Sequence, residues 1–176
     1  THFAPAMAIT NLRKTEKIPA RVCEILFDFV LHPFWECTTG VDVIFTPHEC
    51  FTRPLIEKGF RPEQILPLGL PVRAAFSRRI PKAEARQKLG LSDRFTVMVM
   101  LGGGGMGGSR KILKQLLRVK TPLQILMVNG KDSRSQVQID RLLARKKTSH
   151  QVKNYGFVTE VDLMMEAADC LVGKCG

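Results

Sequence analysis

The chain has 176 residues, of which 44% are hydrophobic and 24% are charged. This composition is typical of a globular protein and excludes a disordered chain, and no apolar run approaches the roughly 18 residues of a membrane-spanning helix. The formal net charge of +11 indicates an anionic partner, which could be nucleic acid, an anionic membrane surface or a phosphorylated substrate.

Strand-like and helix-like segments alternate along the chain. In chain order, the apolar runs predict strands over residues 21–27, 41–46, 65–70, 95–101, 123–128, 152–157 and 170–173. Helices are predicted to include residues 54–58, 83–89, a segment capped by Ser109, and residues 140–147 and 162–167. This alternation predicts an α/β fold with parallel sheets.

Residues 71–95 differ from this pattern because they are rich in Arg and Lys, hold two prolines and contain one amphipathic helix. We interpret them as a connector between two α/β units, and we place the domains at residues 1–76 and 95–176 with the connector at 77–94. Each unit has about half the strands of a complete doubly wound domain. We therefore expect a fragment, or the ordered part of a longer protein.

The basic residues are spread along the chain, with small clusters at Arg78–Arg79, Arg110–Lys111 and residues 145–147. Aromatic residues do not alternate with them, which argues against a single-strand nucleic-acid platform. The five cysteines form no CxxC pair and predict reduced thiols. No cluster of ligands has the spacing of a metal site, so we expect neither a metal nor another cofactor.

The most informative segment is FTVMVMLGGGGMGGSRKILKQLL, at residues 95–117, where a strand leads through a Gly-rich loop into a helix. Glycine lets backbone N–H groups approach an anion, and a helix start adds free donors and a positive dipole end. A dinucleotide site would require an acid at the end of the next strand, and a P-loop would require a Lys after Gly108. A nucleotide-sugar diphosphate fits best, and a tight turn without a ligand is the alternative.

Three motifs occur together with this loop: Phe27-Asp28-Phe29 followed by His32-Pro33-Phe34-Trp35, and then GLPVR at residues 69–73 with Phe76. In this order they resemble the diacylglycerol glycosyltransferases, namely monogalactosyldiacylglycerol synthase and the processive diacylglycerol glucosyltransferases of glycosyltransferase family 28. The resemblance covers essentially the whole chain. It implies a GT-B fold, in which two Rossmann-like domains carry the lipid acceptor and the UDP-sugar, respectively.

The resemblance also implies the residues of the donor site. Glycines of the loop would wrap the UDP diphosphate, the Gly-Phe turn at residues 156–157 would meet the uracil edge, and Arg73 would reach a phosphate. The residues expected to bind the UDP-sugar are Gly102, Gly103, Gly104, Gly105, Met106, Gly107, Asn129, Gly130, Gly156, Phe157, Val158, Lys174, Gly176 and Arg73. For Arg73, Phe157 and Lys174, a structural or solvated role is the competing interpretation.

Inverting transfer to an alcohol needs a base, and the base that the family proposes, a His in an N-terminal Gly-x-Gly-His loop, is absent here. Asp28 and His32 are the remaining candidate catalytic residues, with a structural role as the alternative for His32.

The resemblance implies hexose transfer from a UDP-sugar to diacylglycerol by a cytoplasmic enzyme, peripheral on the inner face of the cell membrane and attracted to anionic lipid. The alternatives are N-acetylglucosamine transfer to a lipid-linked peptidoglycan precursor and a non-catalytic nucleotide-binding module. The sugar, processivity and oligomeric state do not follow from the sequence.

Overall fold

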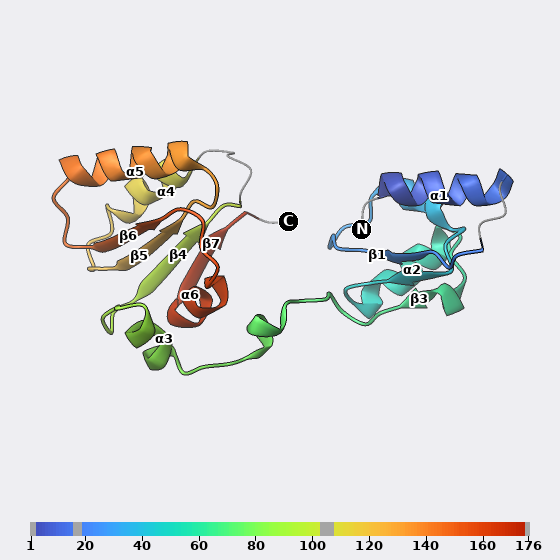
Figure 1. The fold of residues 1–176 in the computed structure, drawn as a ribbon, viewed down its shortest axis with the longest axis horizontal. Helices are drawn as coiled ribbons and strands as arrows, with labels where there is room; N and C mark the ends of the chain where they lie inside the picture. Colours follow the sequence, from blue (N-terminus) through green and yellow to red (C-terminus); the bar gives the residue numbers. More distant parts are fainter. Residues whose placement is uncertain (1–2, 16–18, 103–107, 175–176) are drawn as a thin grey trace. The chain divides into compact units, whose positions relative to one another are not determined.

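The structure is a computed structural model that describes residues 3–15, 19–102 and 108–174. It divides into two compact units, Thr1–Val72 and Arg73–Cys175 (Figure 1). Each unit contains one parallel sheet, which confirms the predicted α/β fold.

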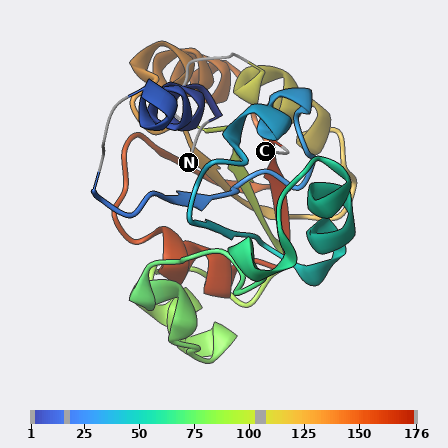
Figure 2. The same ribbon diagram turned by 90° about the vertical axis from the view of Figure 1, so that its right-hand side faces the viewer.

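The first unit contains a three-stranded parallel sheet in the order β1-β2-β3. Its strands are β1 (Cys23–Ile25), β2 (Val43–Phe45) and β3 (Ile65–Leu66). The helix α1 (Phe3–Thr15) lies over this sheet in Figures 1 and 2, and α2 (Thr52–Glu57) connects β2 towards β3. Three short 3-10 helices complete the unit: η1 (Pro33–Thr38), η2 (Glu49–Phe51) and η3 (Pro62–Gln64).

The core of the first unit is a single apolar cluster in which Leu26, Ile44 and Leu55 are completely buried. All three strands are shorter than predicted. The third ends at Leu66 because Pro67, which has no N–H, follows it, and Gly69 then takes a left-handed conformation with φ +84°. The helix α1 was not predicted, because residues 3–9 are apolar throughout and form no single apolar stripe.

The second unit contains a four-stranded parallel sheet in the order β6-β5-β4-β7. Its strands are β4 (Thr96–Met100), β5 (Gln124–Val128), β6 (Gln151–Tyr155) and β7 (Cys170–Gly173). Helices α4 (Ser109–Leu116) and α5 (Ser133–Arg145) pack on one face, and α3 (Lys82–Lys88) and α6 (Val161–Ala167) on the other (Figure 1). Every residue of β5 is buried, as expected for a central parallel strand covered on both sides.

The helix predicted after Ser109 exists, but Ser109 is not its cap. Gly108, at φ +103°, is the N-cap of α4, and Ser109 is its buried first residue. The conformation explains the difference, since a left-handed residue before the helix favours glycine over serine. The helix predicted over residues 140–147 begins earlier, because the Asp132 side chain accepts the Ser135 N–H and caps α5.

Part of the segment interpreted as a connector packs firmly on the second unit. Arg86 of α3 is 8% exposed, donates to the Ala167 carbonyl and forms ion pairs with Asp93 and, at 2.6 Å, with Asp169. Asp169 also accepts from Lys82 Nζ at 2.6 Å and from the Thr96 N–H at 2.7 Å. This network, formed around the residue that precedes β7, holds α3 against the sheet. The boundaries drawn at residues 76 and 94 stay a prediction.

Candidate functional site

A pocket of about 220 Å³ lies at the carboxyl end of the sheet in the second unit. Its walls come from the residues that end or follow β4, β5 and β6, and from the start of α6. They are Met100, Gly102, Val128, Gly130, Lys131, Phe157, Val158 and Val161. Four predicted donor-binding residues, Gly102, Gly130, Phe157 and Val158, are thus brought together from three separate loops.

The sheet topology explains why a ligand site would lie here. In the order β6-β5-β4-β7 the chain moves outward in one direction from β4 and then returns to the other side of it at β7. Open α/β sheets bind ligands beyond the carboxyl ends of the strands at such a switch point. The Gly-rich loop follows β4 at this position.

The described ends of the Gly-rich loop both adopt left-handed conformations. Gly102 has φ +86° and Gly108 has φ +103°. No side chain caps the N-terminus of α4 at Gly108. No capping side chain therefore competes with a ligand for the first N–H groups of the helix. The predicted ligands Gly103, Gly104, Gly105, Met106 and Gly107 lie outside the described residues.

The turn after β5 is fixed by the neighbouring strand β6. The Asn129 side chain donates to Asn154 Oδ1 at 2.8 Å and to the Tyr155 carbonyl at 2.9 Å, and the Gly130 N–H donates to the Gly156 carbonyl at 3.1 Å. Asn129 is 4% exposed and does not line the pocket. Its contacts therefore position Gly130, and a direct contact between Asn129 and a donor stays a prediction.

The turn after β6 presents an aromatic ring to solvent. Phe157 is 68% exposed, so it is not a core residue, which was the competing interpretation. Gly156 precedes it at a close approach to α5, where an added Cβ would lie 2.8 Å from Gln136 Oε1. An exposed ring beside a pocket can stack on a nucleobase.

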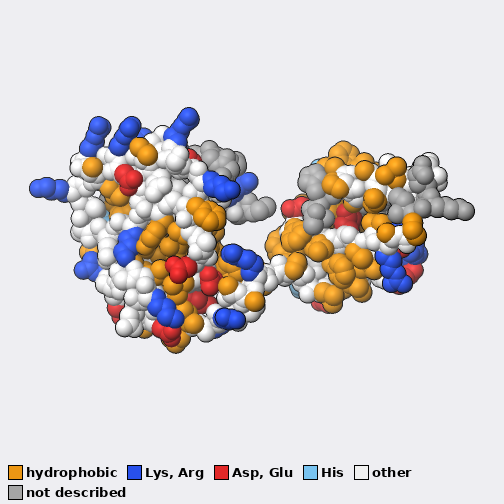
Figure 3. Space-filling view, in the orientation of Figure 1, with side chains coloured by type: hydrophobic (Ala, Val, Ile, Leu, Met, Phe, Trp, Pro, Cys, Tyr) orange, Lys and Arg blue, Asp and Glu red, His pale blue; other side chains and the backbone are white. Residues whose placement is uncertain are grey.

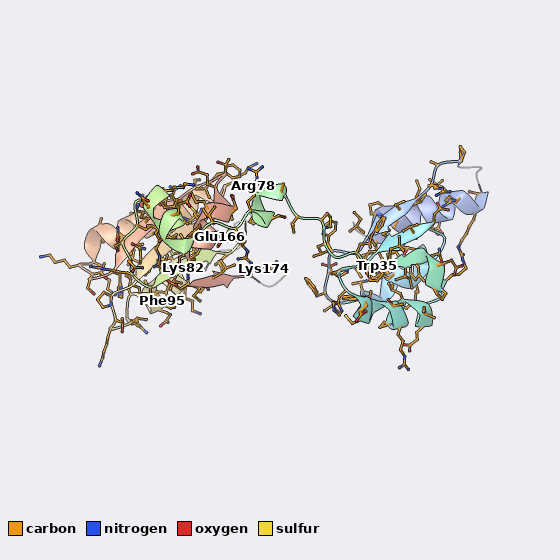
Figure 4. All side chains as sticks on the ribbon, turned by 90° about the horizontal axis from the view of Figure 1, so that it is seen from below. Trp35, Arg78, Lys82, Phe95, Glu166 and Lys174 are labelled. Carbon is orange, nitrogen blue, oxygen red and sulfur yellow. The ribbon has the colours of Figure 1, made fainter. Side chains whose placement is uncertain are left out.

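Sequence reasoning missed Lys131, the one charged residue among the described residues that line this pocket. The available signal was its position directly after the Asn129-Gly130 turn. Lys174 is exposed and directly follows β7, next to the point where β7 pairs Gly173 with Met100 of β4 (Figure 4). Both lysines therefore lie near the carboxyl ends of strands, Lys131 after β5 and Lys174 after β7. Gly176 lies outside the described residues.

The two candidate catalytic residues lie on the surface of the first unit, in the loop after β1. The His32 ring stacks on Phe3 with 4.7 Å between centroids, and its Nδ1 accepts the Phe34 N–H at 3.3 Å as the cap of η1. These contacts support a structural role for His32, and a catalytic role stays a prediction. Asp28 is exposed, and its carboxylate has no hydrogen-bond partner within the described part of the chain.

The GLPVR segment contributes to a pocket in the first unit, and its Arg73 contacts Phe76 in the second unit. A pocket of about 300 Å³ in the first unit is lined by side chains that follow or belong to its strands: Ile25, Phe45, Leu68, Gly69, Leu70 and Pro71. Arg73 is exposed, and its guanidinium lies 5.2 Å from the centre of the Phe76 ring. This cation–π contact supports a bracing role, and phosphate binding by Arg73 stays a prediction.

Comparison with solved structures identifies the class of fold. The chain is similar to the Anabaena protein HepE in complex with UDP, with a TM-score of 0.59 and 13% identity over 97% of this chain and 50% of HepE. It is also similar to the lipopolysaccharide outer core galactosyltransferase WaaB in its apo form, with a TM-score of 0.53 and 14% identity over 97% of this chain and 47% of WaaB. The predicted GT-B fold class is confirmed.

Comparison with known sequences identifies the relatives. Residues 1–72 match the family described as monogalactosyldiacylglycerol (MGDG) synthase, and this match ends where the first unit ends. The processive diacylglycerol beta-glucosyltransferase of Bacillus mycoides is 28% identical over 98% of this chain, and that of Bacillus pumilus is 27% identical over the same share. The predicted relationship to the diacylglycerol glycosyltransferases is confirmed, and the chain spans 44% of the length of both relatives.

Proposed function

We propose that this chain is part of an inverting glycosyltransferase that moves a hexose from a UDP-sugar to diacylglycerol at a membrane surface. One observation carries the proposal. In a chain related over 98% of its length to diacylglycerol glucosyltransferases, the loops after β4, β5 and β6 converge on one pocket at the switch point of a parallel sheet.

The pocket contains groups suited to each part of UDP. The exposed Phe157 ring provides a stacking surface for the uracil. The Gly-rich loop and the start of α4 provide backbone N–H donors for the diphosphate. Lys131 offsets the negative charge that develops on UDP as the bond to the sugar breaks.

The acceptor is assigned to the first unit. The pocket around Leu68 and Pro71 has no charged lining residue among those described and suits an apolar acyl chain. Asp28 is better placed than His32 to assist the acceptor hydroxyl. Its carboxylate is exposed and has no hydrogen-bond partner among the described residues, whereas His32 Nδ1 is occupied by the Phe34 N–H. Such a carboxylate would accept the proton directly or orient another base.

No helix within the described ranges is long and apolar enough to cross a membrane. Contact with a diacylglycerol-containing membrane is then proposed to be peripheral. The charge of +11 would favour an anionic leaflet, by about 1 kcal/mol for each well-placed Lys or Arg.

The test uses the full-length protein. We expect UDP to raise its melting temperature and NAD to leave it unchanged, and we expect turnover with UDP-glucose or UDP-galactose on diacylglycerol vesicles. The sugar that turns over decides between glucosyl and galactosyl transfer. Stabilisation by NAD without stabilisation by UDP would contradict the proposal.

A matched pair of variants tests the position of the nucleotide. Phe157 and Phe95 are both exposed, but Phe157 lies beside the pocket whereas Phe95 precedes β4 at the opposite end of the strand (Figure 4). We expect Phe157→Ala to weaken UDP binding by about 1–2 kcal/mol, through the loss of stacking, and Phe95→Ala to leave it unchanged. Equal affinities of the two variants would remove Phe157 from the site.

A further inference from the structure

A second pocket of about 260 Å³ lies on the helical layer formed by α4 and α5, outside the candidate donor pocket. Three of its five lining residues are arginines: Arg110 near the start of α4, and Arg141 and Arg145 on α5. Gln138 adds a neutral amide, and Leu142 provides the apolar part of the wall. No carboxylate is among the lining residues that the structure describes.

The spacing of these residues explains how one groove gathers so much charge. Arg134, Gln138, Arg141 and Arg145 follow one another at intervals of four, three and four residues, so they share one face of α5. All four are exposed. Arg110 completes the groove from the neighbouring helix.

The surrounding segment carries most of the charge of the chain. Residues 109–150 contain eleven Lys and Arg and two Asp, a formal charge of +9 out of the total of +11. Figure 3 shows Lys and Arg side chains projecting from this helical layer. The net positive charge is therefore concentrated in this segment, although basic residues occur along the whole chain.

The two acidic side chains of this segment, Asp132 and Asp140, accept hydrogen bonds from other residues of the protein. Asp132 accepts from the Ser135 N–H at 3.0 Å and from the Ser135 hydroxyl at 2.6 Å, and Asp140 accepts from Asn154 Nδ2 at 2.7 Å. Neither carboxylate pairs with an arginine of the groove. Across the described part of the chain, Arg110, Arg141 and Arg145 form no ion pair.

Like charges held in one pocket repel each other unless an anion lies between them. Guanidinium groups bind phosphate through paired N–H donors, so three of them around one groove form a site for a phosphate group. Residues 109–150 contain no Phe, Tyr or Trp that would stack on bases, which favours a lipid headgroup over single-stranded nucleic acid. The half-buried Leu142 and the exposed Val137 suit the edge of a bilayer.

We infer that the arginine groove of α4 and α5 binds the phosphate of an anionic phospholipid headgroup and thereby holds the second unit on the membrane. This inference rests on the proposed function, because it assigns the membrane contact of that enzyme to a particular surface. The groove contacts the headgroup and takes no part in the transfer of the sugar.

The test measures partitioning of the full-length protein onto vesicles of phosphatidylcholine with and without phosphatidylglycerol. We expect wild-type protein to prefer the anionic vesicles, and the double variant Arg141→Gln/Arg145→Gln to lose roughly twenty-fold in partitioning. The control Arg53→Gln/Arg94→Gln removes the same charge from two exposed positions outside the groove and should lose less than about threefold. Unchanged melting temperatures confirm that both double variants are folded.

Equal losses in the two double variants would overturn the inference, because net charge alone would then explain the binding. If inorganic phosphate at constant ionic strength stabilises the wild-type protein but not the Arg141→Gln/Arg145→Gln variant, while both partition equally onto the anionic vesicles, the inference is overturned in favour of a free anion. If the double variant loses binding to duplex DNA but partitions onto the anionic vesicles as wild-type protein does, it is overturned in favour of nucleic acid. UDP stabilisation is measured on the same samples: protein that binds UDP but ignores anionic vesicles contradicts this inference alone, whereas protein that binds the vesicles but not UDP contradicts the proposed function.

Discussion

Each of the two units of this chain has a carboxyl group at a strand of its parallel sheet, Glu24 in β1 and Asp169 directly before β7, but the surroundings of the two groups differ. In the second unit Asp169 accepts hydrogen bonds from Lys82, Arg86 and the Thr96 N–H. In the first unit Glu24 is 2% exposed, and neither of its carboxyl oxygens accepts a hydrogen bond from the described residues. The Thr10 hydroxyl and the Trp35 indole N–H are also buried there without a described partner.

The pKa values of the two carboxyl groups show the consequence of this difference. Burial raises the pKa of Glu24 from 4.5 to about 7. Burial also acts on Asp169, but the hydrogen bonds from Lys82 and Thr96 and the charge of Arg86 outweigh it and lower the pKa of that group. Donors and cations around Asp169 favour its charged form, whereas burial without such partners favours the neutral form of Glu24.

The largest expected effect comes from breaking the satisfied network. Asp169→Ala leaves Arg86 largely buried without one of its partners and should reduce the free energy of unfolding by about 3 kcal/mol. Chemical denaturation measures this change. Glu63→Ala breaks the exposed pair with Arg61 and should cost less than about 1 kcal/mol. A comparable cost for the two variants would show that the network adds nothing beyond a surface pair.

A smaller effect comes from the unsatisfied carboxyl group. Because the folded-state pKa of Glu24 lies above its ordinary value, the folded protein holds the proton more tightly than the unfolded chain does. The stability from this proton is fully present below about pH 4.5 and is lost as the pH rises through about 7.

Glu24→Gln removes this titration. Between pH 5 and pH 8 we expect the variant to gain about 1–3 kcal/mol of unfolding free energy relative to wild-type protein. Urea unfolding at the two pH values measures the difference, and Glu49→Gln, at an exposed position, is the control. A difference between Glu24→Gln and wild-type protein that does not change with pH would contradict the assignment.

The smallest effect on stability is expected from substituting two matched glycines, one in each unit. Gly69 has φ +84° and Gly102 has φ +86°, and beyond the adjacent residues no atom of the described residues lies within 4 Å of an added Cβ at either position. Substitution by Ala should therefore cost about 1 kcal/mol of backbone strain in both cases. Only Gly102→Ala should also weaken UDP binding, by about fivefold or more in calorimetry, because only Gly102 adjoins the proposed diphosphate loop. Equal UDP affinities would exclude this loop as the phosphate site.

Much of the second unit could be predicted from its sequence. Residues 123–128 are apolar except for Gln124, and the central strand β5 occupies nearly the same range because it is buried on both faces. The helices predicted to include residues 54–58 and 83–89 exist as α2 and α3, and Gly59 and Gly90 follow them with φ values of +95° and +59°, the left-handed conformation common just after a helix. The carboxyl-end location of the pocket followed from the same alternation of strands and helices.

Other features could not be predicted because they depend on contacts between distant segments. The interactions of Arg86 with Asp169 and of Gly130 with Gly156 join residues that no local pattern relates. The role of Lys131 in the pocket wall was missed for the same reason. His32 resembled a catalytic residue in the sequence, and only its contacts with Phe3 and Phe34 showed how its ring is held.

The sequence by itself determined the α/β class, the Gly-rich turn after β4 and the relationship to diacylglycerol glycosyltransferases, because periodicity, glycine and motif order are local properties of a chain. The tertiary structure decided which loops share a pocket, which carboxyl group is left without partners and where the positive charge gathers. These features depend on strand order and helix packing. They place residues such as Arg110 and Arg145 around one groove although 34 positions separate them in the sequence.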